Sequence, residues 1–80
     1  MKQHWLVGYD RKTETEEFEM AIPARTFLEG RSVVSFDAGD PDGAGSYRLT
    51  DDQAHEIAAR AGKRGQLPPG LDFFLEGYTA

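Results

Sequence analysis

Cysteine is absent from this chain of 80 residues, so neither a disulfide nor a cysteine-ligated zinc ion can hold the fold together. The sequence also has no apolar run of the roughly 18 to 20 residues that a membrane-spanning helix requires. Its first residues lead into a strand-like pattern without the apolar core of a signal peptide. We therefore expect one domain, residues 1–80, located in the cytoplasm and without a membrane partner.

Basic residues are scarce, with nine Lys and Arg against fourteen Asp and Glu. The acids are grouped in residues 10–19, 37–42 and 51–56. Such a surface repels phosphate backbones and attracts basic proteins. The one cationic cluster, Arg60 with Lys63 and Arg64, fits the negative end of a helix dipole. The charge pattern predicts a basic protein partner and no direct contact with nucleic acid.

Two segments of alternating polarity, residues 4–10 and 16–22, flank a short polar stretch and predict an antiparallel hairpin with one buried face. The side chains expected on that face are Trp5, Val7 and Tyr9 in the first strand and Phe18, Met20 and Ile22 in the second.

Pro23 suits the first turn of a short helix over residues 24–29. The β-branched, apolar residues 32–36 predict a third strand, and residues 46–49 a fourth. The sequence between them, 37–45, has the composition of a long turn.

A second helix is predicted over residues 51–61, because Thr50 and Gln53 have the spacing of a capping box. The last strand is predicted over residues 71–78, with Phe74 on the face opposite to Phe73 and Leu75. Either a partner or the remainder of the chain would cover Phe74.

The element order β-β-α-β-β-α-β predicts an α+β fold. We expect an antiparallel sheet of four to five strands, with one main helix and one short helix packed on one face. The expected core is Trp5, Val7, Tyr9, Phe18, Met20, Ile22, Phe27, Tyr47, Leu49, Ile57, Phe73 and Leu75.

Catalytic and metal-binding patterns are incomplete. His55-Glu56 begins a zinc-protease motif, but Ala59 stands where the second histidine is needed. The acids of residues 37–42 lack the first ligand and the terminal glutamate of a calcium loop, which favours a solvated turn. We therefore expect no enzymatic activity, no cofactor and no metal.

Because these patterns are incomplete, we expect the function to be protein binding, with exposed acids and an aromatic side chain in the contact. The expected contact residues are Glu14, Glu16, Glu17, Glu19, Asp37, Asp40, Asp42, Phe74 and Tyr78.

Three segments, residues 5–10, 47–54 and 72–76, together resemble a group of small uncharacterised bacterial domains. Some of these are similar to immunity proteins that neutralise polymorphic or contact-dependent toxins. The resemblance implies an inhibitor that covers the active site or the substrate groove of a basic, nuclease-type toxin domain, and it assigns no functional residue. The alternative is a non-enzymatic accessory or regulatory domain, either a monomer or a weak homodimer that pairs through an edge strand.

Overall fold

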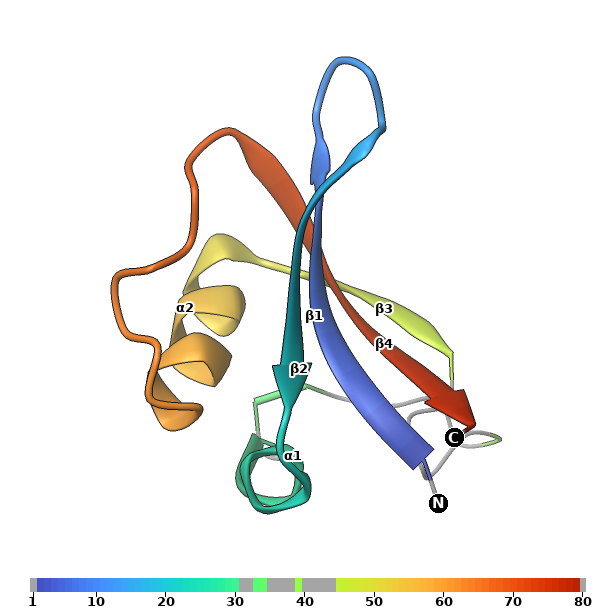
Figure 1. The fold of residues 1–80 in the computed structure, drawn as a ribbon, viewed down its shortest axis with the longest axis vertical. Helices are drawn as coiled ribbons and strands as arrows, with labels where there is room; N and C mark the ends of the chain where they lie inside the picture. The colour runs from blue at the N-terminus through green and yellow to red at the C-terminus, as the bar shows by residue number, and fades with distance from the viewer. Residues whose placement is uncertain (1, 31–32, 35–38, 40–44, 80) are drawn as a thin grey trace.

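The structure, a computed structural model, describes residues 2–30, 33–34, 39 and 45–79. They form one four-stranded antiparallel sheet in the order β2-β1-β4-β3, with two helices, which confirms the predicted α+β class (Figure 1). The elements are β1 Lys2–Asp10, β2 Glu16–Ile22, α1 Ala24–Gly30, β3 Ser46–Leu49, α2 Asp51–Arg60 and β4 Leu71–Thr79.

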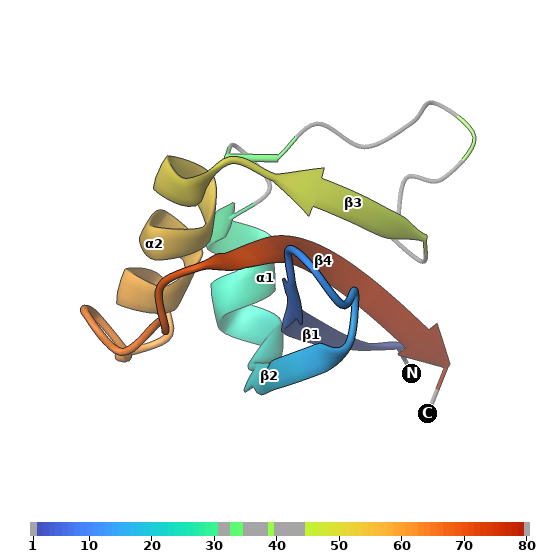
Figure 2. The same cartoon turned by 90° about the horizontal axis from the view of Figure 1, so that it is seen from above.

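The centre of the sheet joins the two ends of the described chain. Strands β1 and β4 pair antiparallel over nine residue pairs, from Lys2↔Thr79 to Asp10↔Leu71. Both helices pack against one face of this sheet (Figure 2), and neither is long and apolar enough, within the described residues, to span a membrane. The opposite face carries no described helix; we call it the open face.

The hairpin between β1 and β2 is closed by Asp10. Its carboxylate Oδ1 accepts hydrogen bonds from the N–H groups of Lys12 at 2.8 Å and Thr13 at 2.9 Å. Glu14 follows with a φ of 59°, a conformation that only a small fraction of non-glycine residues adopt. A register shift beside Gly8 then lets β2 resume its pairing with β1.

The capping box of α2 is confirmed. The hydroxyl of Thr50 accepts from the Gln53 N–H at 3.1 Å, and the Gln53 Oε1 accepts from the Thr50 N–H at 2.9 Å. The Gln53 Nε2 also donates to the carbonyl of Val33 at 2.9 Å. This helix side chain therefore holds both its own cap and a preceding loop.

The third strand predicted over residues 32–36 is wrong where the structure describes it. Val33 and Val34 lie in a turn and a bend, while residues 32, 35 and 36 are outside the described residues. The Val33 carbonyl bonds to a helix side chain rather than to a strand, and Val34 is buried in the core. At Val33 and Val34 the β-branched pattern therefore corresponds to packing against the core and not to pairing in the sheet.

The predicted orientation of β1 is also wrong. Leu6 and His4 face the helices, where Leu6 is fully buried and His4 stacks on Phe27 with ring centroids 3.6 Å apart. Trp5 and Tyr9 lie on the open face and are only partly buried. Because β1 is central, it carries apolar side chains on both faces, so alternation alone could not choose between them.

The other predicted core positions are confirmed in the structure. The buried ones are Ile22, Leu49, Ile57, Phe73 and Leu75, and those partly buried against them are Phe18, Met20, Phe27 and Tyr47. Small helix residues, Ala54 and Ala58, let α2 approach the sheet closely.

Candidate binding face

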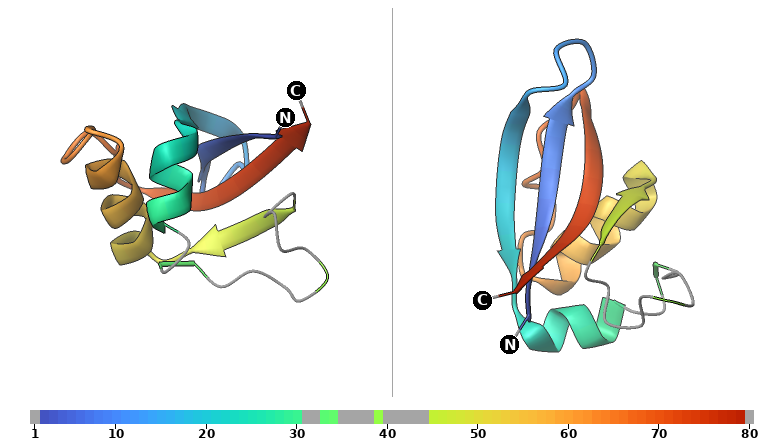
Figure 3. Two further views of the ribbon diagram at one scale, coloured as in Figure 1. Left: turned by 90° about the horizontal axis from the view of Figure 1, so that it is seen from below. Right: turned by 90° about the vertical axis from the view of Figure 1, so that its right-hand side faces the viewer.

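The open face is formed by alternate residues of all four strands. Figure 3 (right) shows β1, β2 and β4 in front of α2. The pairing register places the residues of the open face as follows: Trp5, Val7 and Tyr9 from β1, Glu19 and Ala21 from β2, Ser46 and Arg48 from β3, and Asp72, Phe74 and Glu76 from β4. Val7 at the middle of this face is fully buried although no described helix covers it. Its strand neighbours Glu19 and Phe74 flank it on either side.

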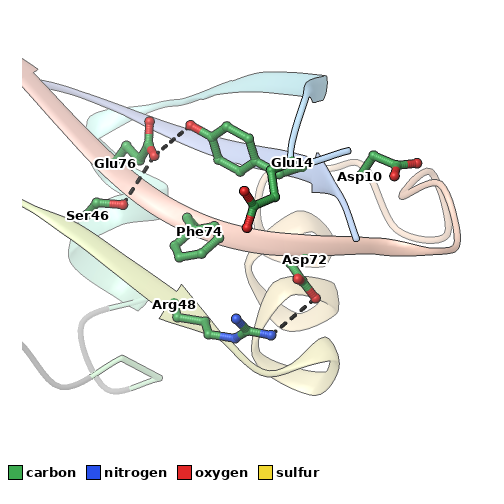
Figure 4. Close-up of a pocket in the computed structure, with 8 residues that line it drawn as sticks. Asp10, Glu14, Ser46, Arg48, Asp72, Phe74 and Glu76 are labelled. Carbon is green, nitrogen blue, oxygen red and sulfur yellow. Dashed lines mark hydrogen bonds and ion pairs between the residues drawn. The ribbon is translucent and has the colours of Figure 1, made fainter. Parts of the chain in front are cut away.

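A hollow of about 320 Å³ lies on this face beside the hairpin (Figure 4). Four carboxylates, one guanidinium, two aromatic rings and a hydroxyl line it: Asp10, Glu14, Asp72, Glu76, Arg48, Tyr9, Phe74 and Ser46. The lining is therefore both aromatic and predominantly acidic, which suits a cationic side chain.

Phe74 provides the apolar wall of the hollow. Its ring meets that of Tyr9 edge to face, with centroids 5.5 Å apart and planes at 81°. The Arg48 guanidinium lies 5.9 Å from the same ring. The prediction that Phe74 lies opposite to Phe73 is confirmed, and neither helix covers it. The side chain of Tyr78, the other predicted anchor, is outside the described residues.

Glu76 is a nearly buried carboxylate, 9% exposed, that lines the hollow. Its Oε2 accepts hydrogen bonds from the Tyr9 hydroxyl at 3.0 Å and the Ser46 hydroxyl at 3.1 Å. The pKa of Tyr9 is raised above 10.0 by partial burial, then by its hydrogen bond to Glu76 and by the charges of Glu76, Glu16 and Glu19. Tyr9 is thus a neutral donor in an acidic setting.

Asp72 has two cationic partners, in contrast to the acids of the hairpin. Arg11 Nε lies 3.1 Å and Arg48 Nη2 3.2 Å from its Oδ1. Arg11 also reaches Asp51 at 3.6 Å and donates to the carbonyl of Leu71 at 3.3 Å. These contacts fasten the hairpin to β4 and to the start of α2.

The four glutamates predicted from the hairpin, Glu14, Glu16, Glu17 and Glu19, are all exposed. The ion pairs of Arg11, Arg48 and Arg60 use other acids: Asp51, Asp72 and Glu56. Glu14 lines the hollow, and Glu16 and Glu19 pair with β1 residues of the open face. Three of the four predicted glutamates therefore gather around one site, with charges that no described cation balances at ion-pair distance.

The predicted loop acids, Asp37, Asp40 and Asp42, lie outside the described residues. The prediction also missed several lining residues, among them Asp72 and Glu76. Both stand two positions from Phe74 in one strand, so alternation alone places them on its face. Tyr9 was missed because it had been assigned to the core.

Within the described part of the chain, no three His, Asp or Glu side chains are grouped so that they could hold a metal ion. His4 is buried on the core face, while His55 is exposed on α2.

Comparison with known families gives one match. A family model described as a domain of unknown function, DUF7683, matches residues 3–76. This range contains β2, β3 and both helices in full, and β1 and β4 except for Lys2 and residues 77–79. No curated protein and no solved structure matches the chain.

Proposed function

The chain belongs to the DUF7683 family of domains of unknown function, and we propose that its open face binds a basic segment of a partner protein. The hollow beside the hairpin takes a cationic side chain of that partner. The exposed glutamates around it steer the encounter and supply the counter-charges.

The observation that carries this proposal is the uneven distribution of counter-charges. The arginines Arg11, Arg48 and Arg60 are all engaged with acids outside the hairpin glutamates. Uncompensated like charges held on one surface disfavour the isolated protein, and a basic partner relieves that repulsion. The aromatic pair Tyr9 and Phe74 beside them adds the anchor that a charged patch alone lacks.

The partner class that fits best is a nuclease-type toxin domain, for which this protein acts as the immunity protein. A nuclease must present a cationic groove to phosphates, and an acidic surface that covers the groove blocks the substrate. The resemblance of residues 5–10, 47–54 and 72–76 to small uncharacterised bacterial domains, some of which are similar to immunity proteins, supports the same assignment.

Co-expression tests this function. The first step is to establish whether the gene immediately upstream encodes a large secreted protein with a variable C-terminal domain. Where it does, that domain is the probe, expressed in cells with and without the protein. We expect the protein to restore growth, and Glu16→Lys with Glu19→Lys to abolish the rescue, because the change replaces two unbalanced negative charges beside the hollow. Failure of the unchanged protein to rescue contradicts the immunity role.

The matched control carries the same change in charge elsewhere. Asp52→Lys with Glu56→Lys alters two exposed acids of α2, away from the hollow. We expect this variant to protect cells as the unchanged protein does. Equal loss of rescue in both variants would show that only net charge matters and would contradict the role of the open face. Circular dichroism and thermal unfolding verify that each variant folds.

A further inference from the structure

Strand β2 forms one edge of the sheet, and no described strand pairs with its outer side. It is seven residues long, whereas β3 at the other edge has four. A long edge strand presents unpaired N–H and C=O groups and is a template for another strand.

The hairpin fixes which groups of β2 point outward. The Asp10 N–H donates to the Thr15 carbonyl at 2.9 Å, so the backbone groups of Asp10 point toward the β2 side. Along a strand this direction alternates, and Leu6, four residues earlier, therefore bonds to its β2 partner Met20. The residues on either side of Met20 turn their N–H and C=O groups to the outer edge: Glu19 and Ala21.

The charge of β2 determines which strand can pair there. Glu16, Glu17 and Glu19 are exposed along it. Pairing of two copies through this edge would bring two acidic strands side by side, and like charges facing each other across strands are destabilising. A strand with alternating Lys or Arg would instead place opposite charges across the new ladder. The edge therefore disfavours a homodimer and favours a basic strand.

We propose that the partner contributes a basic β-strand that pairs with the outer edge of β2 and extends the sheet. This inference rests on the proposed function, because it assumes that the partner is basic. It adds the mode of contact: main-chain hydrogen bonds to Glu19 and Ala21, with the partner's cationic side chains above the open face.

Trp5 makes this edge directly observable. It is the only tryptophan of the chain, and it pairs with Ala21 in the sheet. It lies partly exposed on the open face, so a strand added beside Ala21 changes its surroundings. Its fluorescence therefore reports pairing at β2.

The experiment uses two synthetic peptides with the full-length protein. The first is a peptide of alternating Lys and Val, about as long as β2. The second has the same sequence and charge but carries N-methyl groups on alternate residues, which removes the donors of one edge. Binding is followed by Trp5 fluorescence, and amide exchange is measured by NMR at Glu19 and Ala21. We expect the first peptide to bind about tenfold more tightly and to protect both amides.

Ala21→Pro provides the matched change in the protein. Proline removes the outward N–H of an edge residue and leaves the pairing with β1 intact. We expect this variant to lose about tenfold in affinity for the first peptide, while Ala21→Ser binds as the unchanged protein does.

The outcomes separate the two proposals. Equal binding of both peptides, with Glu19 and Ala21 unprotected, overturns strand pairing and leaves the basic-partner proposal standing. Binding of neither peptide overturns strand pairing and counts against a basic partner as well. Equal affinity of Ala21→Pro and Ala21→Ser also overturns the pairing.

Discussion

Gly8 lies on the core face, where an added side chain would meet neighbouring side chains closely. A Cβ atom added there would lie 2.8 Å from Leu71 Cδ1 and 3.0 Å from Phe73 Cε1. Both neighbours are buried and have little room to move. We predict that Gly8→Ala destabilises the fold by about 1 to 3 kcal/mol, the usual cost of overpacking a core. Urea unfolding followed by Trp5 fluorescence measures this change.

Gly39→Ala is the control for that substitution. A Cβ atom at Gly39 would meet nothing within 4 Å, so the free energy of unfolding should stay within about 0.5 kcal/mol of the unchanged protein. Equal stability of the two variants would show that Gly8 is not needed for close packing.

Ionisation of Tyr9, which lines the hollow, makes the stability of the fold depend on pH. Because its pKa is raised in the folded state, the neutral phenol stabilises the fold. This contribution is fully present below about pH 10, the pKa of an unperturbed tyrosine, and is lost as pH rises through the raised value. Ultraviolet titration curves of the unchanged protein and of Tyr9→Phe differ by the ionisation of Tyr9. We expect this difference to show that Tyr9 ionises above pH 10. Ionisation of that tyrosine at or below pH 10 would contradict the contact with Glu76.

At the residue scale, side-chain orientation could be predicted only where the two faces of a strand differ in polarity. Along β2, Glu17, Glu19 and Ala21 alternate with Phe18, Met20 and Ile22, and the predicted face is confirmed. Along β1, Leu6 and Val7 are adjacent and both fully buried, so the pattern favours neither face. The assignment of Trp5 and Tyr9 to the core failed for this reason.

Gln53, near the start of α2, bonds both to the helix cap at Thr50 and to the distant carbonyl of Val33. Gln53→Glu keeps an oxygen for the Thr50 N–H but replaces the donor to Val33 with a second carboxylate oxygen. We predict a loss of about 1 to 3 kcal/mol, because the loop carbonyl then faces an acceptor. Thermal unfolding measures the loss. Thr50→Ser keeps the cap and should cost little, whereas a neutral result for Gln53→Glu would remove the role of Val33.

At the element scale, local signals placed most boundaries. The capping box set the start of α2, and alternation set β2 and β3 with the bounds observed. The predicted strand at residues 32–36 failed at Val33 and Val34 because these two residues pack against the core and not into the sheet, a tertiary effect that no local pattern contains.

On the scale of the whole molecule, composition revealed the acidity but not its arrangement. The sequence grouped the acids of residues 10–19 as one segment, yet it gave no sign that Arg11 and Arg48 would both pair with Asp72. That choice arises when the hairpin, β3 and β4 meet in the sheet. It leaves the hairpin glutamates without described ion-pair partners and makes them the basis of the proposed contact.

The salt dependence of binding to the lysine-valine peptide tests this central claim most directly. Binding is measured by Trp5 fluorescence from low to high salt for the unchanged protein and for Glu16→Lys with Glu19→Lys. We predict that the unchanged protein loses about tenfold or more in affinity as salt rises, and that the variant binds weakly at every salt concentration. Affinity that is independent of salt and equal in the two proteins would contradict recognition by the hairpin glutamates.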